Sequence, residues 1–330
     1  MREGINPQKL EKKLELDKIH RIVVVVYIPE LTGFYKNSFE VFKLCIDSLI
    51  STIDKHAAVT VVNNGSCAEV YAFLNDYLHL GKIDSVIHHR TNIGKIDAQI
   101  GAARGVREKL ITLTDSDILF KAGWQMNVEK VFHSFNGVGS VSPIPVKDGL
   151  FYGTTSVLKA VLLRKVRFKR ESIPGNFDDY NKYLNSINWD LETDKDKKWT
   201  IIYSGNTKAV IGSGHQVLTV DRDILFKTVP TKPSLTLVGG DSEFSYVDAP
   251  IDKAGKMRLS TYNNYAFHMG NNLEPWMIDV QKDNEKSRVE DSNLDMRNTV
   301  SVDLLNTRFK DKFFGLKKRI VKKIFALFYN

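Results

Sequence analysis

Two carboxylates one residue apart, Asp115 and Asp117, directly follow an apolar, β-branched run at residues 111–114. If the strand continues through them, its alternation places both side chains on the same side, with Ser116 opposite. Two hard oxygen ligands at a strand end suit a divalent cation such as Mg²⁺ or Mn²⁺, above all one that already carries a diphosphate. Asp-x-Asp is also ordinary turn sequence, so a turn without chemistry is the competing interpretation.

The surrounding sequence predicts the elements that position this pair. Residues 21–28 are branched and apolar without alternation, which is typical of a strand covered on both faces. Further apolar patterns predict helices over 39–53, 69–80 and 96–110, and strands over 57–62, 85–88 and 109–113. Alternating strands and helices predict an α/β fold with a mostly parallel, doubly wound central sheet flanked by helices.

Polar turns follow the four predicted strands. Because ligands of doubly wound sheets bind beyond the carboxyl ends of the strands, these turns outline a site of nucleotide size. The candidate binding residues in them are Pro29, Glu30, Asn63, Asn92, Lys95 and Asp115. Glu30 is a candidate only by its position after the first strand, and Lys95 is equally explained as a solvated surface lysine.

The charge of the chain is concentrated at one end. The 330 residues carry a net charge of +8, and residues 308–330 hold eight basic residues against one acid. The remainder is close to neutral, which argues against a nucleic-acid-binding body. Cys45 and Cys67 lie in apolar segments without metal-ligand spacing, so neither a disulfide nor a metal role is expected for them.

Five motifs, in this order, resemble those of family 2 glycosyltransferases, which have the GT-A fold. They are the buried strand ending at Pro29 and the segments 61–66 (VVNNGS), 92–95 (NIGK), 114–117 (TDSD) and 239–244 (GGDSEF). A later segment, 266–271 (AFHMGN), resembles a histidine segment of some related enzymes. The likeness covers about residues 21–271 and implies sugar transfer from a nucleotide sugar.

The resemblance implies a metal and donor site. Asp115 and Asp117 would hold Mn²⁺ or Mg²⁺ together with the diphosphate, and His268 would be a third ligand unless it is a packing histidine. Asn63 stands where the family usually has an Asp that reads the nucleobase, and an amide offers a donor as well as an acceptor. UDP is the expected nucleotide, and Lys95 is expected to contact either its nucleobase or a phosphate.

The resemblance also implies a general base, which an inverting transfer needs to take the proton of the acceptor hydroxyl. Asp241 takes the place of the catalytic aspartate, and Glu243 that of the acid two positions later. Gly240 replaces the acid that usually precedes the base, so the choice between Asp241 and Glu243 stays open. Asp241 is also explained as a helix N-cap, worth about 1 kcal/mol.

The basic segment 308–330 carries an apolar stripe at helical spacing, formed by Phe309, Phe313, Leu316, Ile320, Ile324 and Leu327. Such a helix is typical of one that lies in an anionic membrane surface, where each basic residue adds about 1 kcal/mol. The alternative is an ordinary helix docked on the domain. Residues 1–20 lack the apolar stretch of a secretory signal, and no long uncharged apolar run occurs. We therefore expect a cytoplasmic protein, peripheral at the inner face of the cell membrane.

Together these features predict an N-terminal extension (1–20), a GT-A domain (21–275), a charged linker (276–307) and a basic amphipathic helix (308–330). The predicted function is metal-dependent, inverting sugar transfer to a saccharide or lipid-linked acceptor in surface polysaccharide biosynthesis. One alternative is a catalytically inactive GT-A scaffold or carbohydrate-binding protein at the membrane. A second is a sugar nucleotidyltransferase, which should carry a glycine-rich, basic phosphate loop that residues 29–33 (PELTG) do not provide.

Overall fold

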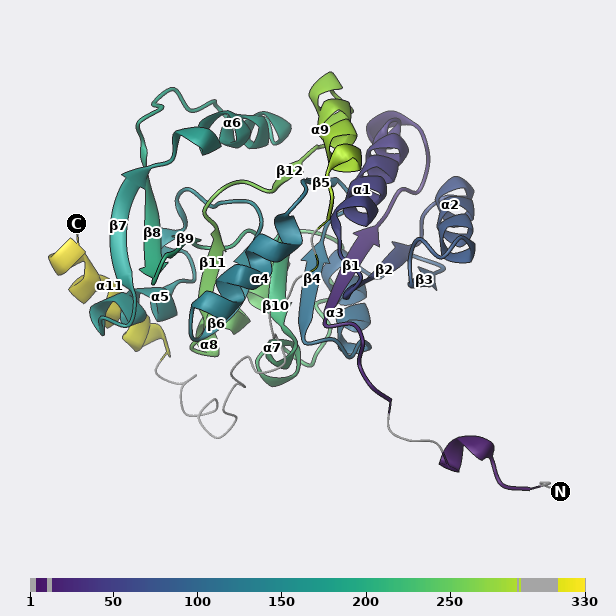
Figure 1. Ribbon diagram of the computed structural model, residues 1–330, viewed down its shortest axis with the longest axis horizontal. Helices are drawn as coiled ribbons and strands as arrows, with labels where there is room; N and C mark the ends of the chain where they lie inside the picture. Colours follow the sequence, from purple (N-terminus) through teal and green to yellow (C-terminus); the bar gives the residue numbers. More distant parts are fainter. Residues whose placement is uncertain (1–3, 11–13, 290, 292–313, 330) are drawn as a thin grey trace.

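The computed structural model describes residues 4–10, 14–289, 291 and 314–329. Its main sheet has ten strands in the order β3-β2-β1-β4-β10-β6-β11-β9-β8-β7 (Figure 1). In that order the strands are β3 (Ser85–His89), β2 (Ala57–Asn64), β1 (His20–Val26), β4 (Leu110–Thr114), β10 (Val217–Asp221), β6 (Val138–Ser142), β11 (Met257–Thr261), β9 (Thr207–Ile211), β8 (Lys198–Ser204) and β7 (Arg167–Ser172).

Helices cover both faces of the sheet, as the unbroken apolar run of β1 requires. Ile22, Val24 and Val26 pack into one core, whereas Val23 and Val25 pack into the other. Residues of α1 (Ser38–Thr52), α2 (Ala68–His79), α4 (Trp124–Ser134), α5 (Thr155–Leu162) and α9 (Pro275–Lys286) belong to the first core. Residues of α3 (Lys95–Arg104), α7 (Arg222–Lys227) and α8 (Ala249–Lys253) belong to the second. The predicted α/β class with flanking helices is confirmed.

Parallel pairing joins four neighbouring strands at one side of the sheet and recurs at one pair in the other half. Strands β3, β2, β1 and β4 run parallel to one another, and β6 runs parallel to β11. Strand β10 is antiparallel to both β4 and β6, and the run β11-β9-β8-β7 is antiparallel throughout. The structure thereby refines the expectation of a mostly parallel sheet: parallel pairs predominate from β3 to β4, and antiparallel pairs predominate from β4 to β7.

A small second sheet brings a distant segment to the Asp-x-Asp turn. Strand β4 ends at Thr114, so residues 115–117 form a turn and do not extend the strand as predicted. Strand β5 (Ile118–Phe120) then pairs antiparallel with β12 (Ala266–His268), which places His268 opposite Ile118. Backbone hydrogen bonding of these strands therefore fixes the position of His268 relative to the turn.

Two predicted boundaries differ from the structure. The helix predicted over 96–110 ends at Arg104, because Gly105 follows and the chain must turn into β4. The predicted linker 276–307 begins inside helix α9, which continues to Lys286. The Asn284 side chain donates to the Phe120 carbonyl at 2.8 Å and thereby ties α9 to β5. Residues 292–307 lie outside the described part of the chain.

The C-terminal helix α11 (Phe314–Tyr329) packs against α5 and β7. Phe325 is fully buried, with its ring 6.2 Å from Phe151 and 5.3 Å from Phe168. One face of the helix is thus docked on the domain, the arrangement that the sequence left as an alternative. Of the predicted stripe, Leu316, Ile320, Ile324 and Leu327 are exposed, and Phe309 and Phe313 lie outside the described residues. None of the helices that the structure describes has the length and apolarity needed to cross a membrane.

Candidate functional site

A cleft of about 520 Å³ opens beyond the carboxyl ends of β1, β2 and β4. These strands are parallel and adjacent, so the turns that follow them meet at one edge of the sheet. The polar lining of the cleft includes Asn64, Asn92, Lys95, Asp115 and Asp117. Three of the residues predicted from the polar turns, Asn92, Lys95 and Asp115, therefore share one cavity with Asp117.

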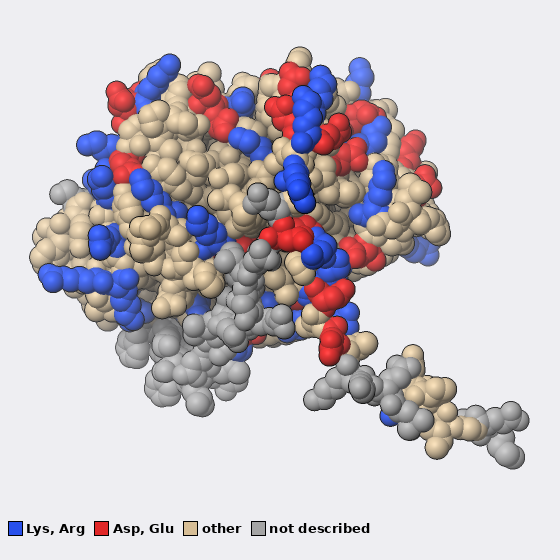
Figure 2. Space-filling view, viewed as in Figure 1, with Lys and Arg blue, Asp and Glu red and all other residues tan. Residues whose placement is uncertain are grey.

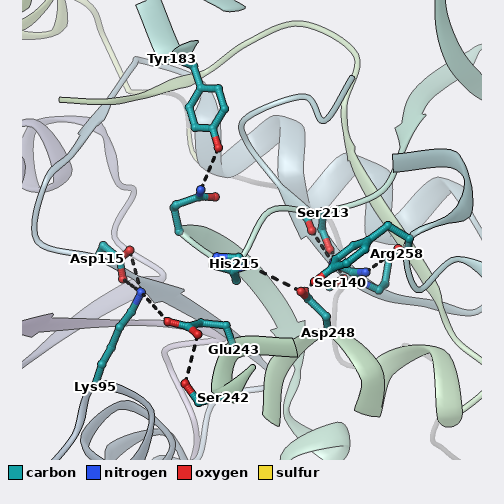
Figure 3. Close-up of polar contacts among 12 residues, drawn as sticks. Lys95, Asp115, Ser140, Tyr183, Ser213, His215, Ser242, Glu243, Asp248 and Arg258 are labelled. Carbon is teal, nitrogen blue, oxygen red and sulfur yellow. Dashed lines mark hydrogen bonds and ion pairs between the residues drawn. The ribbon is translucent and has the colours of Figure 1, made fainter. Parts of the chain in front are cut away.

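Lys95 forms an ion pair with Asp115 in this cleft. Its Nζ lies 2.8 Å from Oδ1 and 2.9 Å from Oδ2 of Asp115, and 3.9 Å from Oε1 of Glu243 (Figure 3). Burial lowers the pKa of Lys95, but the charge of Asp115 and the hydrogen bond to it more than offset this, so the pKa lies above its ordinary value. Lys95 is thus a charged residue of the site and not a solvated surface lysine.

His268 pairs with Asp117. Its Nε2 lies 3.3 Å from Oδ2 of Asp117, and its Nδ1 lies 2.8 Å from the hydroxyl of Ser186. Burial lowers the pKa of His268, whereas the hydrogen bond and charge of Asp117 raise it to a net value above the ordinary one. The structure therefore brings His268 to the Asp-x-Asp turn, as the family resemblance implied.

Asp117 and His268 are the residues that would hold a divalent cation. The Oδ1 atom of Asp117 is buried and accepts no hydrogen bond from the described residues. A carboxylate with an imidazole suits Mn²⁺ better than Mg²⁺, which prefers oxygen ligands. Asp115, the third predicted ligand, is turned toward Lys95 instead. Within the described ranges, no three or more His, Cys, Asp or Glu side chains are grouped as a metal would require. Oxygen atoms of a bound diphosphate would have to complete the coordination.

Asn64 lines the cleft in place of the predicted Asn63. The Asn63 amide hydrogen-bonds to Nδ1 of His88 at 3.1 Å and accepts from the Ser66 amide at 2.8 Å. Asn64 donates to Oδ1 of Asn92 at 2.8 Å. Successive side chains of a strand point to opposite faces, so only one of the two asparagines at the end of β2 reaches the cleft.

Aromatic residues, and not Pro29 or Glu30, line the cleft after β1. Pro29 and Glu30 are exposed and do not contribute to its lining, whereas Tyr27, Phe34 and Tyr35 do. The Tyr35 ring lies 6.0 Å from that of Tyr27 and 5.2 Å from that of Phe34, edge-to-face in both cases. The sequence interpretation missed these three residues, and their only signal was a local enrichment of aromatic residues directly after the first strand.

The two candidate bases differ in their surroundings. Gly239, Gly240 and Asp241 have consecutive positive φ values of 71°, 57° and 62°. Glycine adopts this backbone without strain, which gives a physical reason for Gly240 where the family usually has an acid. The exposed Asp241 carboxylate makes no capping hydrogen bond in the described part of the chain, so its N-cap interpretation is not observed.

Glu243 lies closer to the charged cluster. Burial would raise its pKa, but a hydrogen bond from its own amide, the charge of Lys95 and the Ser242 hydroxyl lower it overall. The Ser242 hydroxyl is 3.1 Å from Oε2 of Glu243. Glu243 is therefore an ionised carboxylate at the edge of the Lys95–Asp115 ion pair.

Residues 34–187 match the sequence model of glycosyl transferase family 2. The match covers α1 to α6 (Phe177–Ser186), including the Asp-x-Asp turn. The match spans just under half of the 330 residues and bears out the resemblance to a family 2-like glycosyltransferase, and the α/β sheet bears out the predicted class of fold. No curated protein matches the chain.

Three solved structures illustrate the similarity. The mannosyltransferase PcManGT from Pyrobaculum calidifontis, solved with GDP-Man and Mn²⁺, is 15% identical over 77% of this chain and 59% of its own, with a TM-score of 0.43. TarS from S. aureus is 13% identical over 79% of this chain and 38% of its own, with a TM-score of 0.43. GalNAc-T7, solved with UDP, GalNAc and Mn²⁺, is 13% identical over 76% of this chain and 44% of its own, with a TM-score of 0.45. This chain thus spans less than two thirds of each of them.

Replacing Lys95 by Met should strengthen cation binding at the turn, because it frees the Asp115 carboxylate beside Asp117. We expect Mn²⁺ alone to stabilise Lys95→Met more than the wild type. Without metal, the free energy of unfolding should fall by about 1–3 kcal/mol, since a hydrogen-bonded charge loses its partner. Thermal unfolding with and without Mn²⁺ measures both effects. Lys253→Met, at an exposed position of α8, is the matched control; an unchanged Mn²⁺ response in Lys95→Met would contradict the role of the carboxylate pair.

Proposed function

Because residues 34–187 match glycosyl transferase family 2, we propose that the protein transfers a sugar from a nucleoside-diphosphate sugar to a hydroxyl of a saccharide or lipid-linked acceptor. The observation that carries the proposal is the joint placement of Lys95, Asp115 and Asp117 in one cleft at the strand ends. We place this transfer in surface polysaccharide biosynthesis, as part of the same proposal.

The diphosphate would bind between Lys95 and the Asp-x-Asp turn. Lys95 is the first residue of α3, so its ammonium and the positive end of the helix act on the same anion. A divalent cation held by Asp117 and His268 would supply neutralisation of the charge that develops on the departing diphosphate. Binding of the anion would draw Lys95 toward the phosphates and release Asp115 for the ion or the ribose.

UDP is the proposed nucleotide. The amides of Asn64 and Asn92 provide both donors and acceptors for a base edge, and the rings of Tyr27 and Tyr35 provide an aromatic face in the same cleft. This combination suits a planar, polar ring with two carbonyl groups and one N–H.

Glu243 is the proposed general base. It is ionised, partly buried and 3.9 Å from Lys95, whereas Asp241 is exposed. In a single displacement, the acceptor oxygen bonds to the anomeric carbon as the bond to the diphosphate oxygen breaks. This displacement inverts the configuration at the anomeric carbon, and the hydroxyl proton passes to Glu243.

The first test is thermal stabilisation by UDP and GDP, each with and without Mn²⁺. Wild type should be stabilised by UDP with Mn²⁺, by about 2.7 kcal/mol at a hundredfold excess over Kd, and Asp117→Ala should lose this response. Asp76→Ala, at an exposed position of α2, should keep it. If neither nucleotide stabilises the wild type, the result contradicts the enzyme proposal and favours a scaffold or carbohydrate-binding protein.

The base assignment is tested by comparing Glu243→Gln with Asp241→Asn. Glu243→Gln should lower the rate of nucleotide release from UDP-sugars by roughly 10²- to 10⁴-fold, the range for loss of a general base, and should keep its UDP stabilisation. A coupled assay for released UDP, run on a panel of UDP-sugars, measures the rates. A loss of this size in Asp241→Asn alone would transfer the role to Asp241.

We further propose that the outer face of α11 attaches the enzyme to an anionic membrane surface. Leu316, Ile320, Ile324 and Leu327 recur at helical spacing and stay exposed although Phe325 docks the helix. Figure 2 marks Lys and Arg side chains at the end of the molecule where Figure 1 draws α11 and β7. The basic residues are Lys317, Lys318, Arg319, Lys322 and Lys323 of α11, with exposed Arg164, Lys165, Arg167, Lys169 and Arg170 of the preceding loop and β7. An apolar stripe bordered by basic residues suits an anionic membrane, because the stripe can enter the lipid surface while the basic side chains contact anionic headgroups.

Vesicle sedimentation tests the membrane proposal without removing α11, because truncation would also uncover Phe151 and Phe168. The wild type should sediment with vesicles of phosphatidylcholine and phosphatidylglycerol, and not with phosphatidylcholine alone. Replacing exposed Arg319 and Lys323 together by Ala should weaken binding by about 2 kcal/mol, roughly 30-fold. The control is a double Lys36→Ala, Lys82→Ala variant, at exposed positions outside α11. Equal binding of the two double variants would refute the assignment to α11.

A further inference from the structure

A buried ion pair lies behind the loop that connects β9 and β10. Arg258 of β11 is 1% exposed and pairs with Asp248, which is fully buried in the helical segment after Glu243. The guanidinium also donates to the Ser213 carbonyl at 2.5 Å and to the Tyr152 carbonyl at 2.8 Å. Breaking one partner of such a pair is strongly destabilising, so Asp248 is held in a fixed position.

His215 contacts this buried ion pair from its solvent-exposed side. Its Nδ1 lies 3.6 Å from the second carboxylate oxygen of Asp248, and its side chain is 36% exposed. Because Nδ1 faces Asp248, the Nε2 atom on the other side of the ring is directed away from the buried pair. Figure 3 draws His215 between Asp248 and the group formed by Lys95, Asp115 and Glu243, and His215 is close enough to Glu243 for its charge to lower the pKa of that carboxyl.

The loop that carries His215 is tied to the donor side of the site. The next residue, Gln216, accepts a hydrogen bond from the Asp115 amide at 2.8 Å through its carbonyl. Its side chain donates to the hydroxyl of Tyr183 at 3.0 Å. Gln216 is therefore held on two sides, which fixes the backbone next to His215, while the imidazole itself is oriented by Asp248.

Tyr152 supplies an aromatic ring near Asp248, the carboxylate that His215 also contacts. It is half exposed, its ring lies 5.4 Å from that of Phe244, and the Arg258 guanidinium lies 5.5 Å from its centroid. Burial and the charge of Asp248 raise the pKa of its hydroxyl, so it stays protonated as a hydrogen-bond donor. An aromatic ring and an imidazole that flank the same carboxylate are suited to a sugar ring, which has an apolar C–H face and hydroxyl edges.

We propose that His215, held by Asp248, and the ring of Tyr152 form the subsite that binds the acceptor sugar next to Glu243. The inference rests on the proposed function and names its acceptor class as a saccharide. His215 acts as a positioning residue: Nε2 hydrogen-bonds the acceptor so that its reacting hydroxyl faces Glu243. Tyr152 holds the C–H face of the same ring. Neither residue lines the cleft proposed for the nucleotide, so acceptor binding and nucleotide binding can be tested separately.

The test compares His215→Gln with His215→Asn, because the Gln amide reaches the position of Nε2 and the Asn amide that of Nδ1. Transfer from a UDP-sugar to a panel of p-nitrophenyl glycosides is measured as a function of glycoside concentration. We expect the KM for the best glycoside to rise at least tenfold in His215→Asn and Tyr152→Ala, and less than threefold in His215→Gln. Stabilisation by UDP and Mn²⁺ should be the same in all three variants as in the wild type. The controls are His79→Ala and Tyr71→Ala, at exposed positions of α2.

The outcomes distinguish failure of the proposed acceptor subsite from failure of the proposed glycosyltransferase function. A KM that does not change in His215→Asn and Tyr152→Ala overturns the subsite while the enzyme assignment stands. A His215→Asn variant that keeps activity better than His215→Gln overturns it as well, since the tie to Asp248 would then be what matters. Wild type that binds UDP but transfers to no glycoside overturns the saccharide class of acceptor. Wild type without any UDP response overturns the proposed function itself.

Discussion

The ion pair between Lys95 and Asp115 is the interaction on which the site depends. It joins the N-terminus of α3 to the turn after β4, and Glu243, more than a hundred residues later in the sequence, lies 3.9 Å from the same ammonium. Carboxylates gathered in a partly buried cleft repel one another, and a buried charge is tolerated only when it is paired. Lys95 provides that compensation, so a phosphate or a cation that enters the cleft has to exchange with an existing pair.

Contacts of the backbone bring these groups together. Strands β5 and β12 place His268 beside Asp117, and the Lys95 amide donates to the Leu237 carbonyl at 2.9 Å. Gly94 is required for the second contact, because a Cβ at that position would lie 2.4 Å from the Thr236 carbonyl oxygen. The segment that leads to Glu243 can therefore approach α3 only over a glycine, and a substitution there would displace the base as well as the donor side.

The two sides of the proposed active site differ in how their charges are held. On the donor side, Lys95 and Asp115 are partly exposed and can exchange partners with a ligand. On the acceptor side, Arg258 and Asp248 are almost completely buried and serve as a fixed support for the loop around His215. The exposed stripe of α11 lies beyond β7, the edge strand of the sheet opposite β3. Membrane contact at that edge would leave the cleft at the other half of the sheet open to the nucleotide.

The sequence by itself determined the α/β class, the doubly covered strand β1, the turns at the strand ends and the family, because apolar periodicity and short motifs are local properties. It also identified Asp117 and His268, whose pairing follows from β5 and β12. Only the tertiary structure decided that Asp115 pairs with Lys95, that Asn64 and not Asn63 enters the cleft, and that α11 docks through Phe325. Such choices depend on which side chains meet across elements far apart in the sequence. The strand pairing and burial that bring them together are properties of the whole fold.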